Sequence, residues 1–360
     1  MSGLDVFTEN FSALRSASMA VLANHAAFSS SGLPTVCELL RNKFSIKKIF
    51  SPEHGISAQG EDGKEQLSGI DKLTGLPVIS LYGQHLSPKE SDLADVEYVV
   101  IDLPNIGCRF YTYWWTLTYM VESCARFGKK VIILDRPNMS NRSPTSMEGP
   151  MLDEEKCNSF LGRWRMPLTY SYSYGELIQY FIRSRNISVS LDVVSHTEQT
   201  PEVFVPPSPS MSEWQTTLIY PGTGLFEGLN INSGRGTAFP FRVMGAPWIN
   251  HLQLFQDFTS QSFTGIKSFP YSYRPEWSRY GGEICHGLYF YVEDHSHFQP
   301  VRMGLWLMNY LSIHYPDHLQ AAIYPTVANP TGENHLDRLL GMENSFSIFC
   351  SGKTIEPDAL

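Results

Sequence analysis

Short apolar runs recur through the first 150 residues, and each is bounded by residues that favour turns. The runs read SMAVLANHA, IKKIFSPEHG, LPVISLYG, VEYVVIDLP and KKVIILDRP. Between several of them lie segments such as LPTVCELLRNKF and YWWTLTYMVESCARFG, whose apolar residues recur three and four positions apart. This alternation is typical of a mainly parallel sheet covered by helices on both faces. We therefore predict an α/β, Rossmann-like, doubly wound domain over residues 1–145.

The style of the sequence changes near residue 150. The remainder is richer in Pro, Ser and aromatic residues, as in VFVPPSPSMSEW. Probable helices such as YGELIQYFIRSR and PVRMGLWLMNYLSIHY are mixed there with short strands such as GLYFYVED. A chain of 360 residues has room for two domains. We predict a smaller C-terminal α+β domain over 146–360 that completes the cleft, with the boundary in the loop RPNMSNRSPTSMEGP.

The composition is that of a folded protein whose partner is not a nucleic acid. Hydrophobic residues make up 42% of the chain, which suffices for a large core. The formal net charge is -9, and the Lys and Arg residues form no dense basic stripe. The six cysteines are scattered without a CxxC pair, which favours reduced thiols over a zinc site. The turn after the first strand reads ANHAAFSSSG and lacks GxGxxG, so dinucleotide binding is disfavoured.

No segment of the sequence indicates a membrane partner. No apolar run approaches the roughly 20 residues that span a bilayer. The N-terminal stretch MSGLDVFTENFSALRS lacks both a basic start and an apolar signal core. We expect a cytoplasmic location as the sequence stands, or a periplasmic one if a signal sequence precedes this chain. The oligomeric state stays open.

Polar residues follow each of the five apolar runs. Because ligands bind at the carboxyl ends of the strands in an open parallel sheet, we expect these residues to gather at one edge. Glu53 is the most distinctive of them, since Pro52 and Gly55 fix an unusual backbone path that would aim its side chain off the sheet. For Asp135 the alternative to a role in ligand binding is that it only orders its own loop. The strand-end residues are Asn24, His25, Glu53, His54, Tyr82, Gly83, Asp102, Asn105, Asp135 and Arg136.

Nine ordered motifs carry a resemblance to a known family. They are FSPEHG, TGLPVISLYG, DLPNIGCRFYTYWWTL, VIILDRPN, EGP, YGEL, PPSPSM, YPGTGLFEGLNINSGRGT and GAPWI. The match to which they belong runs from about residue 17 to beyond residue 310. In content and order the chain resembles the exo-β-N-acetylmuramidase (NamZ-type) family, formerly a domain of unknown function.

The resemblance implies an enzyme that removes N-acetylmuramic acid from the non-reducing end of peptidoglycan fragments. It implies a Rossmann-like domain joined to a smaller one, with the catalytic cleft between them. The substrate partner would be a muropeptide or glycan fragment, and no metal or other cofactor is expected. The Glu of the PEHG motif is the family's proposed catalytic carboxylate, and that position here is Glu53.

Glycosidic cleavage needs one carboxylic acid to protonate the leaving oxygen and a second group to act at the anomeric carbon. We expect Glu53 to be the acid, because a pocket roofed by aromatic residues would raise its pKa. His54 either supports Glu53 or takes part directly. A 2-acetamido sugar can supply its own carbonyl oxygen as the nucleophile, so the second carboxylate stays open. The candidates are Asp102, Asp135, Glu148, Glu176 and Glu227, with Glu227 marginally preferred over Glu176.

Substrate recognition would need a cation for the lactyl carboxylate of muramic acid and aromatic faces for the sugar. Arg235 in SGRGT has glycine neighbours that give it clearance for a bidentate contact, although tethering of a loop is an equally good interpretation. Arg109 and Arg136 are alternatives. One or two of Tyr111, Tyr113, Trp114 and Trp115 are expected to stack on sugar, the rest being core. The predicted substrate-binding set is Asn24, Tyr82, Asp102, Asn105, Arg109, Tyr111, Arg136, Glu176, Asn230 and Arg235.

Glu53, His54, Asn105, Arg109, Glu227 and Arg235 are predicted to line one cleft. The chain departs from the family pattern at five positions, four of which the resemblance places in or beside that cleft. Asn105 replaces an aspartate, Thr169 and Tyr170 replace Arg-His, Ser210 replaces an asparagine, and Ser233 replaces a glutamate. These departures leave a second hypothesis open, a divergent member that binds muramic-acid glycans with weak or altered catalysis. A third is a metal-dependent hydrolase built on Glu53, His54, Asp102 and Asp135, which no HxH or HExxH spacing supports.

Overall fold

The computed structural model describes residues 2–140, 147–196 and 203–357, and the chain divides into two compact units. Unit 1 comprises Met1–Asn105, Tyr111–Met139 and Tyr172–Pro209. Unit 2 comprises Ile106–Phe110, Ser140–Ser171 and Ser210–Leu360. The chain therefore enters and leaves each unit more than once.

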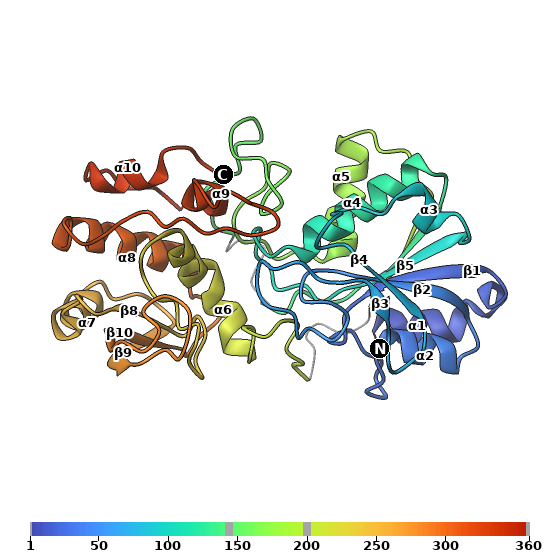
Figure 1. The fold of residues 1–360 in the computed structure, drawn as a ribbon, viewed down its shortest axis with the longest axis horizontal. Helices are drawn as coiled ribbons and strands as arrows, with labels where there is room; N and C mark the ends of the chain where they lie inside the picture. Colours follow the sequence, from blue (N-terminus) through green and yellow to red (C-terminus); the bar gives the residue numbers. More distant parts are fainter. Residues whose placement is uncertain (1, 141–146, 197–202, 358–360) are drawn as a thin grey trace. The chain divides into compact units, whose positions relative to one another are not determined.

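A seven-stranded sheet forms the centre of unit 1 (Figure 1). Its strands are β1 (Ser18–Ala23), β2 (Ser45–Ser51), β3 (Gly69–Ile70), β4 (Pro77–Ser80), β5 (Tyr98–Asp102), β6 (Lys130–Leu134) and β7 (Leu191–Val194). Their spatial order is β3-β4-β2-β1-β5-β6-β7, and only β3 runs antiparallel to its neighbour. Counted along the chain, the six parallel strands lie in the doubly wound order 3-2-1-4-5-6. The predicted Rossmann-like architecture is confirmed.

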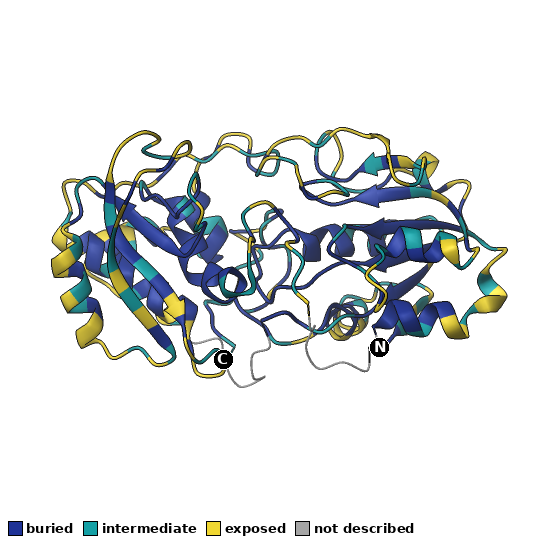
Figure 2. Ribbon diagram, turned by 90° about the horizontal axis from the view of Figure 1, so that it is seen from below, coloured by how far each residue is buried: buried dark blue, intermediate teal, exposed yellow. Residues whose placement is uncertain are grey.

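Helices cover both faces of this sheet. In Figure 1, α1 (Gly3–Asn10) and α2 (Thr35–Arg41) lie on one side, whereas α3 (Glu90–Leu93), α4 (Tyr113–Arg126) and α5 (Tyr174–Ser184) lie on the other. Alternate residues of β1 point to opposite faces, and Met19, Val21 and Ala23 pack in one cluster with apolar residues of α1 and α2. Figure 2 shows the central strands as almost continuously buried, as expected for a sheet covered on both sides.

The extent of unit 1 corrects the domain assignment made from composition. The segment Tyr172–Pro209 belongs to unit 1, because β7 pairs in parallel with β6 and α5 packs beside the sheet. The change to a Pro- and Ser-rich style does not mark the end of the sheet. The predicted boundary between 145 and 146 lies outside the described residues.

Asp135, at the end of β6, fastens the returning segment to the sheet. Its Oδ2 accepts a hydrogen bond from Ser173 Oγ at 2.6 Å, and its Oδ1 accepts one from Gly175 N at 2.9 Å, at the start of α5. Burial raises the pKa of the Asp135 carboxyl, against the effect of these hydrogen bonds. Asp135 therefore has the loop-ordering role that the sequence allowed.

Unit 2 contains a three-stranded antiparallel sheet in the order β8-β10-β9, with β8 at Val243–Ala246, β9 at Ile266–Tyr273 and β10 at Cys285–Val292. Its helices are α6 (Trp214–Thr223), α7 (His251–Ser260), α8 (Pro300–His314), α9 (His335–Leu340) and α10 (Ser345–Cys350). Helices α6 and α8 touch through glycines, since a Cβ on Gly222 would lie 2.1 Å from the Pro300 carbonyl oxygen. The predicted α+β part is confirmed, and its sheet is the smaller of the two, although unit 2 holds the larger share of the chain.

Arg109 is the main internal tether of unit 2. Its side chain is fully buried, and Nη1 donates to the carbonyls of Pro150 at 2.7 Å and Met166 at 3.0 Å. Nη2 donates to the Leu339 carbonyl at 3.0 Å. The guanidinium therefore joins three distant segments of the same unit, and its predicted substrate contact stays a prediction.

None of the helices in the described ranges has both the length and the apolar character needed to cross a bilayer. This finding agrees with the absence of a long apolar run in the sequence.

Substitution of Asp135 tests the attachment of α5. Asp135→Ala leaves Ser173 and Gly175 without their acceptor, so we expect the free energy of unfolding to fall by about 1–3 kcal/mol. Asp135→Asn keeps one acceptor and removes a buried charge, so its loss should be smaller. Urea unfolding measures both, with Asp192→Ala on the exposed face of β7 as the control. An Asp135→Ala protein as stable as this control would contradict the role.

Candidate active site

The Glu53 carboxylate lies just beyond the carboxyl end of β2. The strand ends at Ser51, and a turn is closed by a hydrogen bond from Gly55 N to the Pro52 carbonyl at 3.1 Å. His54 and Gly55 both have left-handed φ angles, of 69° and 75°. The unusual path predicted from the flanking proline and glycine is therefore confirmed, and it is rare for a histidine.

Two donors fix the orientation of the buried Glu53 side chain. Gly63 N donates to Oε1 at 2.9 Å, and Thr112 Oγ1 donates to Oε2 at 2.6 Å. Thr112 stands directly before α4, so a loop and a helix start both hold this carboxylate. Each carboxylate oxygen can accept more than one hydrogen bond, which leaves capacity for a proton or a ligand.

His54 is oriented by its own loop. Its Nδ1 lies 2.8 Å from the Gly60 carbonyl, which can only accept, so Nδ1 carries the proton and Nε2 is the acceptor of the neutral ring. A ring nitrogen of His54 and carboxylate oxygens of Glu53 and Asp62 all lie within 4.8 Å of one another. These three side chains are the group within the described ranges that offers metal-ligand geometry, and Asp62 was not predicted from the sequence.

Two tyrosines lie near Glu53 and stay neutral. The rings of Tyr111 and Tyr113 are 4.6 Å apart, and both are buried. Burial raises the pKa of both phenols, and the nearby Glu53 charge raises them further. Trp114 and Trp115 are fully buried, so the expectation that much of this aromatic run is core is confirmed.

Asn24 and Tyr113 fix the segment around Pro207 to the sheet edge. The Tyr113 hydroxyl donates to the Pro207 carbonyl at 2.6 Å. Asn24 Nδ2 lies 3.0 Å from both that carbonyl and the Tyr113 oxygen. The Asn24 amide is therefore engaged within unit 1.

Asp102 and Arg136 neutralise each other at the end of β5. Arg136 Nε donates to Asp102 Oδ1 at 2.5 Å and Nη2 donates to Oδ2 at 2.9 Å, while Thr35 Oγ1 donates to Oδ2 at 2.6 Å. The Asp102 side chain is fully buried. This bidentate pair gives both residues a structural role, and their predicted roles in substrate binding and catalysis stay predictions.

The other acidic candidates also have local structural partners. Glu176 Oε2 accepts from Ser173 N at 2.8 Å in a capping box at the start of α5, as a first-turn acid does. Glu148 Oε1 accepts from Arg302 N at 2.8 Å at the start of α8. The remaining acidic candidate, Glu227, lies in unit 2 and is described below with Arg235.

Three further predicted residues lie at strand ends or loops. Tyr82 is buried after β4, and Asn105 donates from Nδ2 to the Tyr172 carbonyl at 3.0 Å. Asn230 uses its amide to bridge backbone groups of Gln320 and His318, each at 2.8 Å, so it tethers a loop of unit 2.

Glu227 and Arg235 line a cavity of about 280 Å³ within unit 2, here called the unit 2 cavity. Its walls are Glu227, Ile231, Ser233, Arg235, Ser278, Arg279 and Tyr324. Arg235 Nε donates to Glu227 Oε1, and Nη1 donates to Ser210 Oγ at 2.8 Å. The Arg235 guanidinium also lies 4.9 Å from the centre of the Phe241 ring. Arg235 is thus held on several sides, and Arg279 is a cavity residue that sequence reasoning missed.

The family departures fall into two groups. Thr169 is fully buried, and its Oγ1 accepts from Glu148 N at 2.8 Å, while Tyr170 is also buried. Ser210 and Ser233 adjoin the unit 2 cavity. The expectation that a shared cleft contains Glu53 and Arg235, residues of different units, stays a prediction.

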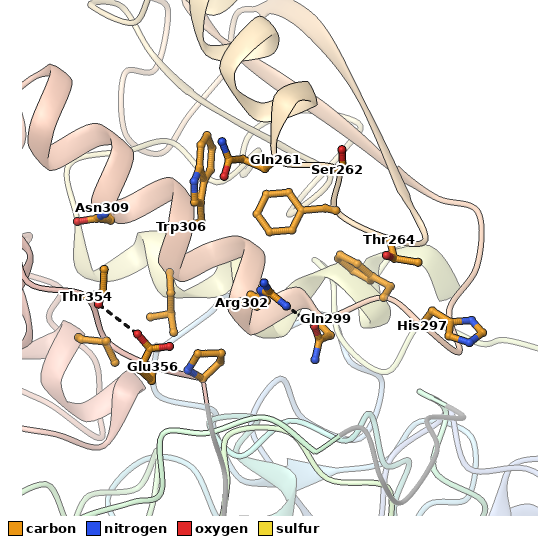
Figure 3. A pocket seen from close by; sticks show the side chains of 15 residues that line it. Gln261, Ser262, Thr264, His297, Gln299, Arg302, Trp306, Asn309, Thr354 and Glu356 are labelled. Carbon is orange, nitrogen blue, oxygen red and sulfur yellow. Dashed lines mark hydrogen bonds between the residues drawn. The ribbon is translucent and has the colours of Figure 1, made fainter.

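Figure 3 shows another pocket of unit 2, of about 240 Å³. Arg302, Trp306 and Asn309 of α8 line it together with parts of 261–264 and 354–357. It contains none of the predicted catalytic or substrate-binding residues, so the candidate active site is assigned to the surroundings of Glu53.

The fold and the site define a two-unit α/β enzyme with a buried, oriented carboxylate at a strand end. The family comparison specifies it further. The model described as "Exo-beta-N-acetylmuramidase NamZ, N-terminal" matches residues 19–215, and the corresponding C-terminal model matches 218–357. The chain belongs to this family, as the resemblance predicted, and it is a glycosidase.

One relative supports this assignment, and two solved structures share the fold. The chain is 33% identical over 329 residues to the peptidoglycan β-N-acetylmuramidase NamZ of Bacillus subtilis, covering 89% of this chain and 79% of that protein. Two DUF1343 family proteins from Bacteroides fragilis, each 24% identical, share the fold. Their TM-scores are 0.82 and 0.72, with coverage of 96% and 98% of this chain and 89% and 91% of theirs.

The burial of Thr169 generates a stability prediction. Thr169→Arg, which restores a typical family residue, would place a charge in a fully buried position, so we expect a loss of about 3 kcal/mol or more. Thr169→Val removes only the hydroxyl that accepts from Glu148 N, so we expect the free energy of unfolding to fall by about 1 kcal/mol. Urea unfolding compares the two. Equal midpoints would show that this position tolerates a charge.

Proposed function

We propose that this protein removes N-acetylmuramic acid from the non-reducing end of peptidoglycan fragments, with Glu53 as the general acid. The observation that carries the proposal is the buried Glu53 carboxyl, oriented by Gly63 N and Thr112 Oγ1 beside two neutral tyrosines. It occupies the position of the family's proposed catalytic carboxylate. The named activity of the B. subtilis relative supports the substrate class.

The proposed reaction begins with transfer of the Glu53 proton to the glycosidic oxygen as its bond to the anomeric carbon breaks. The acetamido carbonyl oxygen of the muramic acid residue attacks that carbon from the other side. Water then opens the cyclic intermediate and returns a proton to the Glu53 carboxylate. The phenols of Tyr111 and Tyr113 keep their protons and therefore do not act as bases.

His54 is proposed as a positioning residue for this step. Its Nδ1 proton is directed at the Gly60 carbonyl, which fixes the ring beside the Glu53 carboxylate. Glu227 forms an ion pair with Arg235, which balances its charge and weakens its case as a base. A nucleophile supplied by the substrate removes the need for a second protein carboxylate.

The binder hypothesis predicts a different outcome at the same site. Ser210 and Ser233 stand at the unit 2 cavity where the family usually has an asparagine and a glutamate, which favours altered recognition. A protein that binds muramic-acid fragments but does not release the sugar, whatever residue stands at position 53, would support that hypothesis.

Glu53→Gln tests the general acid directly. We expect kcat on a muramic-acid disaccharide to fall by about 10²-fold or more with the fold intact, because the variant keeps the side-chain volume but has no proton to transfer. A nitrophenyl muramide has a leaving group that needs little protonation, so its kcat should fall much less. Both rates are measured by sugar and phenol release.

The matched control is Glu90→Gln, which changes an exposed carboxylate of α3 in the same unit. Its kcat should equal that of the wild type. An equal loss on both substrates in Glu53→Gln would remove the leaving-group role, and near-normal turnover would exclude Glu53 altogether.

The cluster of Glu53, His54 and Asp62 is the observation that favours the metal-dependent alternative. Our proposal predicts full kcat after dialysis against EDTA and no stoichiometric transition metal by elemental analysis. Bound metal near one equivalent per chain, lost together with activity on chelation and in Asp62→Asn, would establish the alternative. The metal ligands expected from the sequence included Asp102 and Asp135 in place of Asp62. In the structure, Asp102 and Asp135 are held by other partners.

A further inference from the structure

The unit 2 cavity is lined by two arginines and one glutamate, so one positive charge is not balanced by the ion pair. Glu227 and Arg235 form a salt bridge and are both buried to more than nine-tenths. Arg279 lines the same cavity. The three formal charges therefore leave one net positive charge facing a space of about 280 Å³. Such a cavity favours a single anion.

Arg279 is the cation of this cavity that has no partner in the described parts of the chain. Its side chain is half-buried, and within 2–140, 147–196 and 203–357 its guanidinium makes neither a hydrogen bond nor an ion pair. Two acids of the same loop, Glu276 and Glu283, are exposed and form neither a hydrogen bond nor an ion pair with it. A guanidinium in this position retains its five donors for a ligand.

The backbone around Arg279 has an unusual conformation on both sides. Ser278 and Tyr280 have φ angles of 76° and 60°, a left-handed region that residues other than glycine rarely adopt. Strained backbone of this kind is common where a side chain must be placed for binding. Hydrogen bonds from neighbouring segments hold this loop at fixed points.

Asn232 supplies the principal fixed point. Its buried Nδ2 donates to the Arg279 carbonyl at 2.9 Å and to the Arg235 carbonyl at 3.2 Å. The Tyr280 hydroxyl adds a bond to the Asn230 carbonyl at 2.9 Å. One buried amide thus sets the backbone positions of both arginines that line the cavity.

We propose that the unit 2 cavity is a carboxylate-binding site in which Arg279 supplies the cation that pairs with the ligand. Its ligand class is a carboxylate-bearing amino sugar, and the hydroxyls of Ser233 and Ser278 add polar partners. The choice of N-acetylmuramic acid, through its lactyl carboxylate, rests on the proposed function. The preference for an anion rests on the cavity alone. In this proposal Arg279, and not Arg235, makes the contact with the lactyl carboxylate.

Titration of the Glu53→Gln protein with N-acetylmuramic acid and with N-acetylglucosamine tests this site, because the two sugars differ by the lactyl group. We expect tighter binding of N-acetylmuramic acid, and Arg279→Gln should reduce that preference by about tenfold or more. Arg279→Lys should keep part of it. The matched control is Arg274→Gln, which removes an exposed arginine nearby and should leave the preference unchanged. Binding of N-acetylglucosamine should be the same in all variants.

NMR titration with lactate tests the cavity without any sugar. Shifts at Ser233 and Ser278 that vanish in Arg279→Gln would support the carboxylate site even if the protein hydrolysed no muramide. Retention of the full N-acetylmuramic acid preference in Arg279→Gln would overturn the inference, while Glu53-dependent hydrolysis by an Arg279→Gln protein that keeps Glu53 would leave the proposed function standing. Arg279→Gln could lose binding of both sugars because its fold is disturbed, which a changed unfolding midpoint would reveal. In that case, recovery of the midpoint and of the N-acetylmuramic acid preference in Arg279→Lys would support the inference.

Discussion

Parallel pairing of β1 with both β2 and β5 is the constraint on which the candidate site depends. Leu22 stands opposite Phe50 on one side, and Ala23 stands opposite Asp102 on the other. Strands aligned in this way end together, so the residues that follow them meet at one sheet edge. Glu53 follows β2 at that edge, and the left-handed turn after it holds its side chain close to the start of α4.

Buried carboxylates are used for two different purposes in this protein. Most are anchors: Asp102 binds Arg136, Asp135 binds the start of α5, and Glu148 binds the start of α8. Each of them satisfies backbone or guanidinium donors that burial would otherwise leave unpaired, which would be costly. Glu53 has two donors and neutral phenols nearby but no cationic partner among its described contacts. Asp135 and Glu148 likewise accept from uncharged donors, so the candidate acid is separated from these structural ones by its place beside His54 and Asp62.

The arginines show the same division. Arg109 and Arg136 are tethers of their own units, and Arg235 is balanced by Glu227. Arg279 combines cavity exposure with a fixed backbone, so it can meet a ligand without first breaking an internal contact. A binding group prepared in this way loses little free energy to reorganisation.

The sequence by itself determined the α/β class, the polar strand ends, the family and the distinctive position of Glu53, because periodicity and short motifs are local properties of the chain. It also indicated that most of the aromatic run near Trp114 is core. The tertiary structure decided the rest. Tyr172–Pro209 joins the first unit through pairing of β7, which a composition change cannot reveal. Which acids and arginines are already paired depends on donors far away in sequence, such as Thr35 for Asp102. Arg279 has no recognisable motif, and its importance arises only from the cavity that distant segments of the chain form around it.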